Sequence, residues 1–148
     1  MDELAAGISE LWERRSELSP KDTDARSLVA AAIDLLDSGE ARVATATEDG
    51  DGEVVVHEWL RQAILLFFAL AEVSTIELGP FEYADKVPLK GDFAAAGVRV
   101  VPGASARWGS YLGRGVILMP SYVNIGARVG AGTMVDTWAT VGSCAQIG

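Results

Sequence analysis

Hydrophobic residues in the first part of the chain recur every three to four positions, which is the spacing of one face of an α-helix. The first helix is predicted to end at Ser19-Pro20. The second is predicted to start at Asp22-Thr23-Asp24, which offers N-caps, and to stop at Ser38-Gly39. A third, largely buried helix is predicted over Glu58 to Glu72. The apolar stripes of the first two helices are Leu4, Ile8, Leu11 and Trp12, then Leu28, Val29, Ala32, Ile33 and Leu36.

Two further segments complete this N-terminal region. Arg42 to Thr45 and Glu53 to Val56 flank a turn-rich stretch, Glu48 to Gly52, and this arrangement predicts a hairpin. Residues 73–97 contain two prolines and mixed signals, so a linker with little regular structure is predicted there. The sequence therefore predicts a mainly helical domain over residues 1–97, with a hairpin and a linker.

From Val98 onward the repeat changes to six residues. Branched aliphatic residues stand six positions apart, a small residue lies two positions before each, and glycine or a turn-tolerant polar residue follows most of them. The aliphatic positions are Ile117, Val123, Val129, Val135, Val141 and Ile147, and the small residues are Gly115, Ser121, Ala127, Thr133, Ala139 and Ala145. Neither a helix nor a simple alternating strand has this period, whereas a hexapeptide β-helix does.

In a hexapeptide β-helix each six-residue repeat forms one side of a triangular coil, with the aliphatic side chain inside and glycine at sharp turns of positive φ. The predicted fold class is α+β: the helical domain, then the start of a left-handed parallel β-helix over residues 98–148. These residues supply fewer than three coils and end in mid-pattern at Ile147-Gly148. Because stacked repeats need a covered last coil, the β-helix is expected to be truncated and the chain a fragment.

Charge is distributed unevenly along the chain. The whole chain has a formal net charge of −9, which disfavours binding to nucleic acid or to an anionic membrane. From Val98 onward, however, there are four arginines and one acid, Asp136. A surface with guanidinium groups and few carboxylates suits anionic small molecules.

The chain contains one cysteine, Cys144, and one histidine, His57. One cysteine cannot form an internal disulfide, and the N-terminus lacks the pattern of a secretion signal, so a cytoplasmic location is predicted. Cys144 lies among small residues with no histidine nearby in sequence, which favours a packed side chain over a nucleophile. A structural role is favoured for His57. One histidine excludes a three-imidazole zinc site, and no metal is predicted.

Several motifs resemble one family, the tetrahydrodipicolinate N-succinyltransferases. The most specific runs are Leu118 to Gly126 and Gly132 to Gly148, and Gly97 to Pro102 is similar to the segment that enters the β-helix of that family. Weaker similarity extends upstream to Asp85-Lys86-Val87-Pro88, His57-Glu58-Trp59-Leu60 and Leu35-Leu36-Asp37-Ser38-Gly39. The resemblance covers nearly the whole chain but only the first part of the family's length.

The resemblance implies a homotrimer with active sites in clefts between neighbouring β-helices. It implies transfer of succinyl from succinyl-CoA, a co-substrate, to the amino group of tetrahydrodipicolinate in its open 2-amino-6-oxopimelate form, in lysine and diaminopimelate biosynthesis. By motif, Arg99 matches the arginine that binds a substrate carboxylate, and Asp136 matches the aspartate that contacts the amine. No bound cofactor is implied, and the residues that bind CoA are not assigned.

The residue types fit these roles. Asp136 is suited to orient an ammonium group and help remove its proton, although it also occupies a turn position of the repeat. Arg99 offers a two-pronged donor to a carboxylate, against the alternative of a surface arginine at the domain junction. Arg107, Arg114 and Arg128 are expected to be solvated, and Trp138 and Tyr122 are expected to pack at the trimer interface.

Two other functions remain open on the sequence. One is a non-catalytic, truncated hexapeptide-repeat module that keeps the trimer surface. The other is a different acyl-CoA-dependent acyltransferase, a class that normally uses a histidine of the β-helix as base, and residues 98–148 contain none.

Overall fold

The computed structural model describes residues 1–47 and 52–148, and its N-terminal part is built from three helices, α1 (Asp2–Glu13), α2 (Thr23–Ser38) and α3 (Glu58–Leu70). All three predicted helices are present, although α1 ends at Glu13, before the predicted stop at Ser19-Pro20. The second ends as predicted, because Gly39 adopts φ 81° and caps α2 in the left-handed conformation. Asp22 precedes α2 but its side chain accepts a hydrogen bond from the Ser19 amide (2.8 Å) instead of capping the helix.

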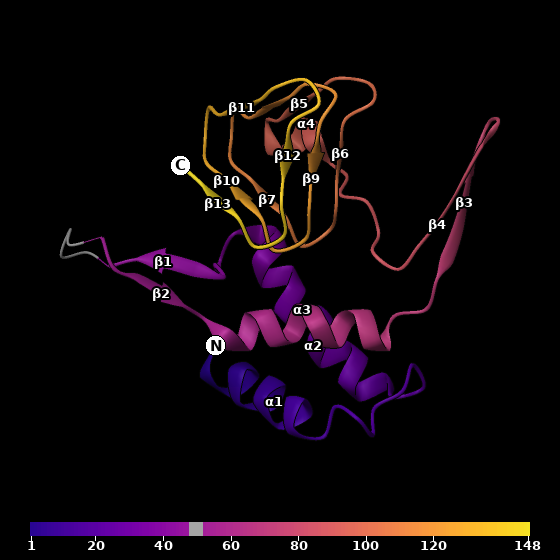
Figure 1. Ribbon diagram of the computed structural model, residues 1–148, viewed down its shortest axis with the longest axis vertical. Coiled ribbons are helices and arrows are strands. Elements are labelled where there is room, and N and C mark those ends of the chain that lie inside the picture. Colours follow the sequence, from indigo (N-terminus) through magenta and orange to yellow (C-terminus); the bar gives the residue numbers. More distant parts are fainter. Residues whose placement is uncertain (48–51) are drawn as a thin grey trace.

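The three helices pack around one apolar cluster, in which α2 passes α3 and reaches the coil of β-strands, while α1 lies farthest from the coil (Figure 1). Ile8 from α1, Ile33 from α2 and Leu66 from α3 are each 1% exposed or less. Their apolar stripes meet because helical residues three and four positions apart share a face.

Two hairpins interrupt the helical part. The predicted hairpin is confirmed as β1 (Ala44–Ala46) paired with antiparallel β2 (Val54–Val56), although the turn predicted over Glu48 to Gly52 lies largely outside the described residues. The prediction of an irregular linker over 73–97 is wrong. This segment forms a second antiparallel hairpin, β3 (Ser74–Leu78) and β4 (Phe81–Asp85), and a short helix, α4 (Phe93–Ala96). The turn at Gly79-Pro80 between two strand-like runs was the overlooked signal.

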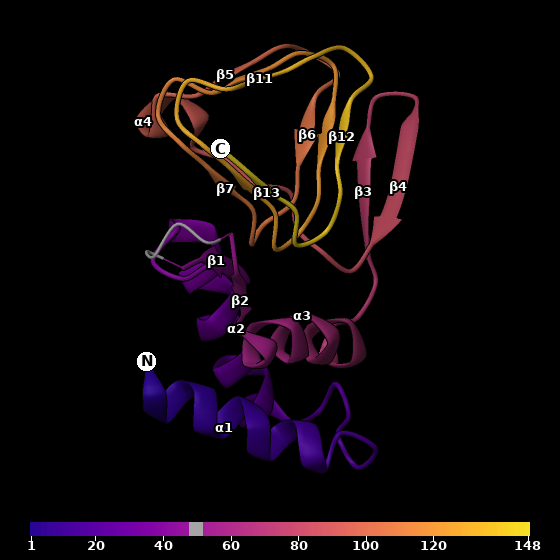
Figure 2. The same ribbon diagram turned by 60° about the vertical axis from the view of Figure 1, so that its left-hand side comes forward.

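The C-terminal part is a coil of two-residue strands arranged in three parallel stacks. The stacks are β5–β8–β11, β6–β9–β12 and β7–β10–β13, so successive strands along the chain belong to successive stacks. Figure 2 looks into this triangular coil. The strands are β5 (Arg99–Val100), β6 (Ser105–Ala106), β7 (Tyr111–Leu112), β8 (Ile117–Leu118), β9 (Tyr122–Val123), β10 (Arg128–Val129), β11 (Met134–Val135), β12 (Thr140–Val141) and β13 (Gln146–Ile147). Stacked parallel strands therefore follow the helical part, in the order that the sequence predicted.

The six-residue register is broken once, between β8 and β9. Three residues connect these strands, whereas four connect every other consecutive pair in the coil. The prediction that Ile117 points inward is therefore wrong: Leu118 is fully buried and Ile117 faces outward. The inward series runs through Leu112 and Leu118 and then steps by five to Val123. Alternate side chains of a strand lie on opposite faces, so a slip of one residue exchanges them.

The sequence predicted positive φ angles directly after each inward residue. In the structure they occur three positions before it. Glycine occupies this corner at Gly126 (φ 76°) and Gly132 (φ 74°), but Trp138 (φ 62°) and Cys144 (φ 64°) occupy the same corner in the last coil. Left-handed backbone is strained for residues with a Cβ. The last described coil therefore holds two strained corners.

Candidate functional site

The three outer faces of the coil have different surroundings. The β7–β10–β13 face lies against α2: the Arg128 guanidinium donates to the Gly39 carbonyl (3.3 Å), and a Cβ built on Gly39 would stand 2.4 Å from the Tyr111 ring. The β6–β9–β12 face lies beside the base of the second hairpin, where Arg107 binds Asp85. The β5–β8–β11 face lies on the side of the coil away from α1, α2 and α3 in both views (Figures 1 and 2).

This third face, which we call the open face, carries two rows of outward side chains. Strand pairing aligns Arg99, Ile117 and Met134 in the first row, since their neighbours in sequence point into the coil. The second row lies two residues further along each strand. Backbone hydrogen bonds keep the strands aligned there, from the Val101 amide to the Leu118 carbonyl and from the Met119 amide to the Val135 carbonyl (both 2.9 Å). The rows are Arg99, Ile117 and Met134, then Val101, Met119 and Asp136.

The structure thus brings both candidate site residues to the open face, at diagonally opposite corners. Arg99 stands on one edge strand, and Asp136 directly follows the other edge strand. Two strand spacings of about 4.8 Å across the face and two residues of about 3.3 Å along the strands separate the two positions, which places them about 12 Å apart. Both residues are exposed, and an apolar strip lies between them. A guanidinium and a carboxylate separated by this distance are suited to hold the two ends of one small zwitterionic molecule.

Asp136 has one oxygen engaged in a local turn. Its Oδ1 accepts a hydrogen bond from the Thr137 amide (2.7 Å), which fixes the carboxylate at the corner between β11 and β12. No other hydrogen bond to this carboxylate occurs within residues 1–47 and 52–148. The turn role and a role toward a ligand are therefore compatible, since each uses a different oxygen.

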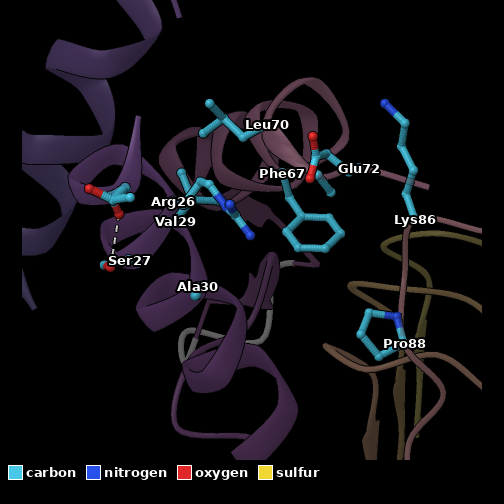
Figure 3. A pocket seen from close by; sticks show the side chains of 11 residues that line it. Arg26, Ser27, Val29, Ala30, Phe67, Leu70, Glu72, Lys86 and Pro88 are labelled. Carbon is cyan, nitrogen blue, oxygen red and sulfur yellow. Dashed lines mark hydrogen bonds between the residues drawn. The ribbon is translucent and has the colours of Figure 1, made fainter. Parts of the chain in front are cut away.

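Three cavities of the described part lie away from these two residues. Their volumes are about 480, 520 and 300 Å³, and neither Arg99 nor Asp136 lines any of them. In the first, Arg26 of α2 and Phe67 of α3 point toward each other across the hollow, with Pro88 on the far side (Figure 3). Lys86 also lines it, but its Nζ donates to the Phe68 carbonyl (2.7 Å). The open face is thus a surface site outside these three cavities.

A polar cluster that the sequence did not reveal joins the second hairpin to the coil. The Arg107 guanidinium donates to Asp85 Oδ2 (2.7 Å) and to Asn124 Oδ1 (3.2 Å). The Tyr122 hydroxyl also donates to Asn124 Oδ1 (3.2 Å), and burial raises the pKa of this tyrosine, so it remains a donor at neutral pH. These partners are 17 to 22 residues from Arg107, a separation at which no local sequence pattern links them.

The expectation that three arginines are solvated holds for one of them. Arg114 is exposed, but the Arg107 side chain is 21% exposed within its cluster, and Arg128 lies 4.0 Å from the centre of the Tyr111 ring. Burial lowers the pKa of Arg128, and Arg42 lowers it further. Arg107 and Arg128 therefore hold the coil against the rest of the chain.

Cys144 and His57 have the structural surroundings that the sequence favoured. Cys144 is half-buried and packs against the helical core beside Ile64. His57 precedes α3 and its Nε2 lies 3.2 Å from the Thr45 hydroxyl of β1. The described residues contain no group of three side chains arranged to hold a metal ion. Within the same residues, no helix is long and apolar enough to cross a membrane.

Comparison with known proteins finds relatives that match this chain over nearly its whole length. Residues 3–70 match the family model described as tetrahydrodipicolinate N-succinyltransferase N-terminal. The 2,3,4,5-tetrahydropyridine-2,6-dicarboxylate N-succinyltransferase of Idiomarina loihiensis is 49% identical over 100% of this chain and 56% of its own length. That of Polynucleobacter asymbioticus is 51% identical over 95% of this chain and 54% of its own. The chain is similar to the N-terminal part of this family along its whole length.

The family resemblance drawn from the motifs is thereby confirmed. The chain matches the N-terminal part of the N-succinyltransferases and spans about half the length of the curated relatives that it matches. The similarity includes both the helical region and the coil that carries Arg99 and Asp136. The open face therefore lies within the shared part of the family.

Proposed function

We propose that the protein takes part in succinyl transfer from succinyl-CoA to the amino group of tetrahydrodipicolinate in its open, 2-amino-6-oxopimelate form, a step toward diaminopimelate and lysine. The relatives are named for N-succinyl transfer to the ring form of this dicarboxylate. The observation that carries the proposal for this chain is the presence of Arg99 and Asp136 on the same uncovered face.

In this proposal the guanidinium of Arg99 binds one substrate carboxylate through two parallel hydrogen bonds. Asp136 accepts a hydrogen bond from the substrate amine through the oxygen that does not bind the Thr137 amide. Holding the amine and accepting its proton favours attack on the thioester carbon, because only the neutral amine is nucleophilic. A carbon–nitrogen bond forms, the carbon–sulfur bond breaks, and CoA leaves as its thiol. Succinyl-CoA is a co-substrate here, and no resident cofactor is required.

We further propose that the coil is a left-handed β-helix and that three chains form a trimer. Support for the handedness is the six-residue repeat with positive φ at its corners. Support for the trimer is the open face, where Met134 is 53% exposed near the two candidate site residues, and the adjoining corner between β11 and β12, where Trp138 is 85% exposed. A neighbouring coil against this face would turn a flat surface site into a cleft. A chain with one cysteine, which can form no internal disulfide, also fits the cytoplasm.

The decisive experiment measures thiol release from succinyl-CoA with and without 2-aminopimelate as amine acceptor. The assay uses this chain and a fusion of it to the remaining C-terminal part of the Idiomarina loihiensis relative. We expect amine-dependent release by the fusion, at least about tenfold lower turnover for Asp136→Asn, and a raised KM for Arg99→Ala.

The matched control is Asp24→Asn, which neutralises an exposed aspartate in the first turn of α2. We expect it to leave turnover unchanged. Near wild-type turnover of Asp136→Asn would remove the catalytic role of this residue. No amine-dependent release by a folded fusion would favour a non-catalytic assembly module.

A further inference from the structure

A cavity between α2 and α3 combines an apolar wall with cationic side chains. Its volume of about 480 Å³ lies within the range of about 300 to 1,000 Å³ that is typical of small-molecule sites. The wall contains apolar residues of both helices and of the segment that follows β4, namely Val29 and Ala30, Phe67 and Leu70, and Pro88. An occupant therefore meets apolar surface on more than one side.

The guanidinium of Arg26 reaches into this cavity from α2, and the Phe67 ring of α3 faces it across the hollow (Figure 3). Arg26 Nη1 donates to the Pro20 carbonyl (3.2 Å). Within residues 1–47 and 52–148, Arg26 has no ion pair and no cation–π contact. Because a guanidinium has five N–H groups, Arg26 can donate to an occupant that packs on the Phe67 ring.

The charges that line the cavity favour an anionic occupant. Two of the lining side chains are cationic, Arg26 and Lys86, and one is a carboxylate, Glu72. Glu72 is exposed and forms no ion pair with either cation in the described part of the chain. The Lys86 ammonium is fixed by its hydrogen bond to the Phe68 carbonyl (2.7 Å) and has two further N–H groups. This cationic surplus, in a chain of formal net charge −9, suits a ligand with one carboxylate.

The cavity also borders the junction between the helices and the coil. Phe67 makes an edge contact with Trp108, with ring centres 5.4 Å apart, and the Pro88 carbonyl accepts a hydrogen bond from the Trp108 amide (2.9 Å). Trp108 lies between β6 and β7, and its Nε1 donates to Asp34 of α2 (3.0 Å). Two residues that line the cavity thus touch the same tryptophan, so an occupant packed on them changes the surroundings of Trp108.

We propose that this cavity binds a small carboxylate with an apolar body, of the size of an arylalkanoate. Arg26 and Lys86 hold the carboxylate, and the apolar body packs against Phe67 and Pro88. The ligand stabilises the junction of the helices with the coil, because it binds only the folded arrangement. The cavity lies away from the open face, so binding there does not depend on the proposed succinyl transfer.

The first test titrates 3-phenylpropanoate into the isotope-labelled chain and follows the amide resonances by NMR. We expect saturable binding with a dissociation constant of about 1 mM or below, which is ordinary for a ligand of this size. The affected amides should cluster in residues 23–30, 67–72 and 86–88, which line the cavity. The neutral analogue 3-phenylpropan-1-ol should bind at least about tenfold more weakly, because it offers no charge to Arg26 and Lys86.

Substitutions separate the charged contact from the apolar one. Arg26→Gln should weaken the binding of 3-phenylpropanoate at least about tenfold and leave the binding of the alcohol unchanged, since it removes only the charged donor. The matched control is Arg61→Gln, which removes an exposed arginine of α3 that does not line the cavity and should bind like the wild type. Ala30→Leu places a larger apolar side chain in the cavity and should weaken the binding of both compounds.

Tryptophan fluorescence tests the contact with the junction. Because Trp108 packs against Phe67, saturating 3-phenylpropanoate should change the tryptophan emission of the wild type. Trp108→Phe should bind the acid by NMR without this change in emission. An emission that the acid leaves unchanged in the wild type would refute the contact with the junction.

Three further results would overturn the binding site itself. They are the lack of saturable binding up to about 10 mM, equal affinity for the acid and the alcohol, and equal weakening by Arg26→Gln and Arg61→Gln. Resonance shifts confined to the surroundings of Arg99 and Asp136 would also overturn it, since the acid would then bind at the open face.

Discussion

Gly126 lies where the coil meets the helices, and substituting it by alanine tests that contact. The residue has φ 76°, and a Cβ added to it would stand 2.7 Å from Ile64 Cδ1 and 3.0 Å from Cys144 Sγ. A left-handed residue with a Cβ is disfavoured by about 1 to 2 kcal/mol, and forcing a methyl group into a packed site costs about 1 to 3 kcal/mol. The loss of unfolded-state entropy offsets about 0.5 to 1 kcal/mol. We expect Gly126→Ala to lower the free energy of unfolding by about 3 kcal/mol.

Gly132→Ala is the matched control for the backbone contribution. Gly132 occupies the next equivalent corner with φ 74°, and a Cβ there would have no heavy atom within 4 Å. We expect this variant to lose about 1 kcal/mol, so the difference of about 2 kcal/mol reports packing against Ile64 and Cys144. Adding Ile64→Val to Gly126→Ala removes the nearest atom and should recover about 1 kcal/mol in a double-mutant cycle.

The assay is urea unfolding followed by far-ultraviolet circular dichroism and tryptophan fluorescence, with coincident transitions as the two-state check. Equal losses for Gly126→Ala and Gly132→Ala would refute the argument, since backbone strain would then account for both. A cycle without coupling between positions 64 and 126 would show that the helices and the coil do not pack there.

Three further predictions concern unfolding free energies measured in the same way. Leu118→Ala should lower the free energy of unfolding by about 3 kcal/mol because Leu118 is fully buried, and Ile117→Ala should lower it by at most about 1 kcal/mol. A larger loss for Ile117→Ala than for Leu118→Ala would mean that the six-residue register continues unbroken. Arg107→Ala should lower the free energy of unfolding by about 2 kcal/mol, because it removes the hydrogen bonds to Asp85 and Asn124. The control is Arg61→Ala, which removes an ion pair with Glu58 that is more than half exposed and should change the free energy of unfolding by at most about 0.5 kcal/mol. Trp138→Gly should raise the free energy of unfolding by about 1 kcal/mol, because glycine adopts the left-handed conformation of this corner without strain. Trp138→Ala keeps the Cβ and should leave the free energy of unfolding unchanged.

The sequence predicted most where the physical signal is local and repeated. Helical spacing located α1, α2 and α3, and the left-handed stop at Gly39 followed from the residue type alone. The six-residue period predicted the coil, because each repeat must present one side chain to a narrow interior. The hairpin β3–β4 was missed because the two prolines of residues 73–97 favoured a linker, although apolar residues alternate with Glu77 and Glu82 on either side of the Gly79-Pro80 turn.

The register of the coil shows a second limit. Ile117 and Leu118 are both branched aliphatics, so a six-residue period accommodates either as the inward residue. The short connection between β8 and β9 decides between them, and it depends on how successive coils stack. Likewise, Trp138 and Cys144 occupy corners where local preference calls for glycine, and their backbone amides donate to the neighbouring coil, at the Pro120 carbonyl (2.7 Å) and the Ile125 carbonyl (3.3 Å).

By itself, the sequence determined the order of the helical region and the coil, the family resemblance, and the identity of Arg99 and Asp136 as candidate site residues. Only the tertiary structure decided that these two share one open face, that Arg107 joins the second hairpin to the coil, and that this hairpin projects as an arm. The reason is physical. Periodicity reports how a residue relates to its neighbours in the chain, whereas a face or a site is made by residues that stacking brings together from distant positions.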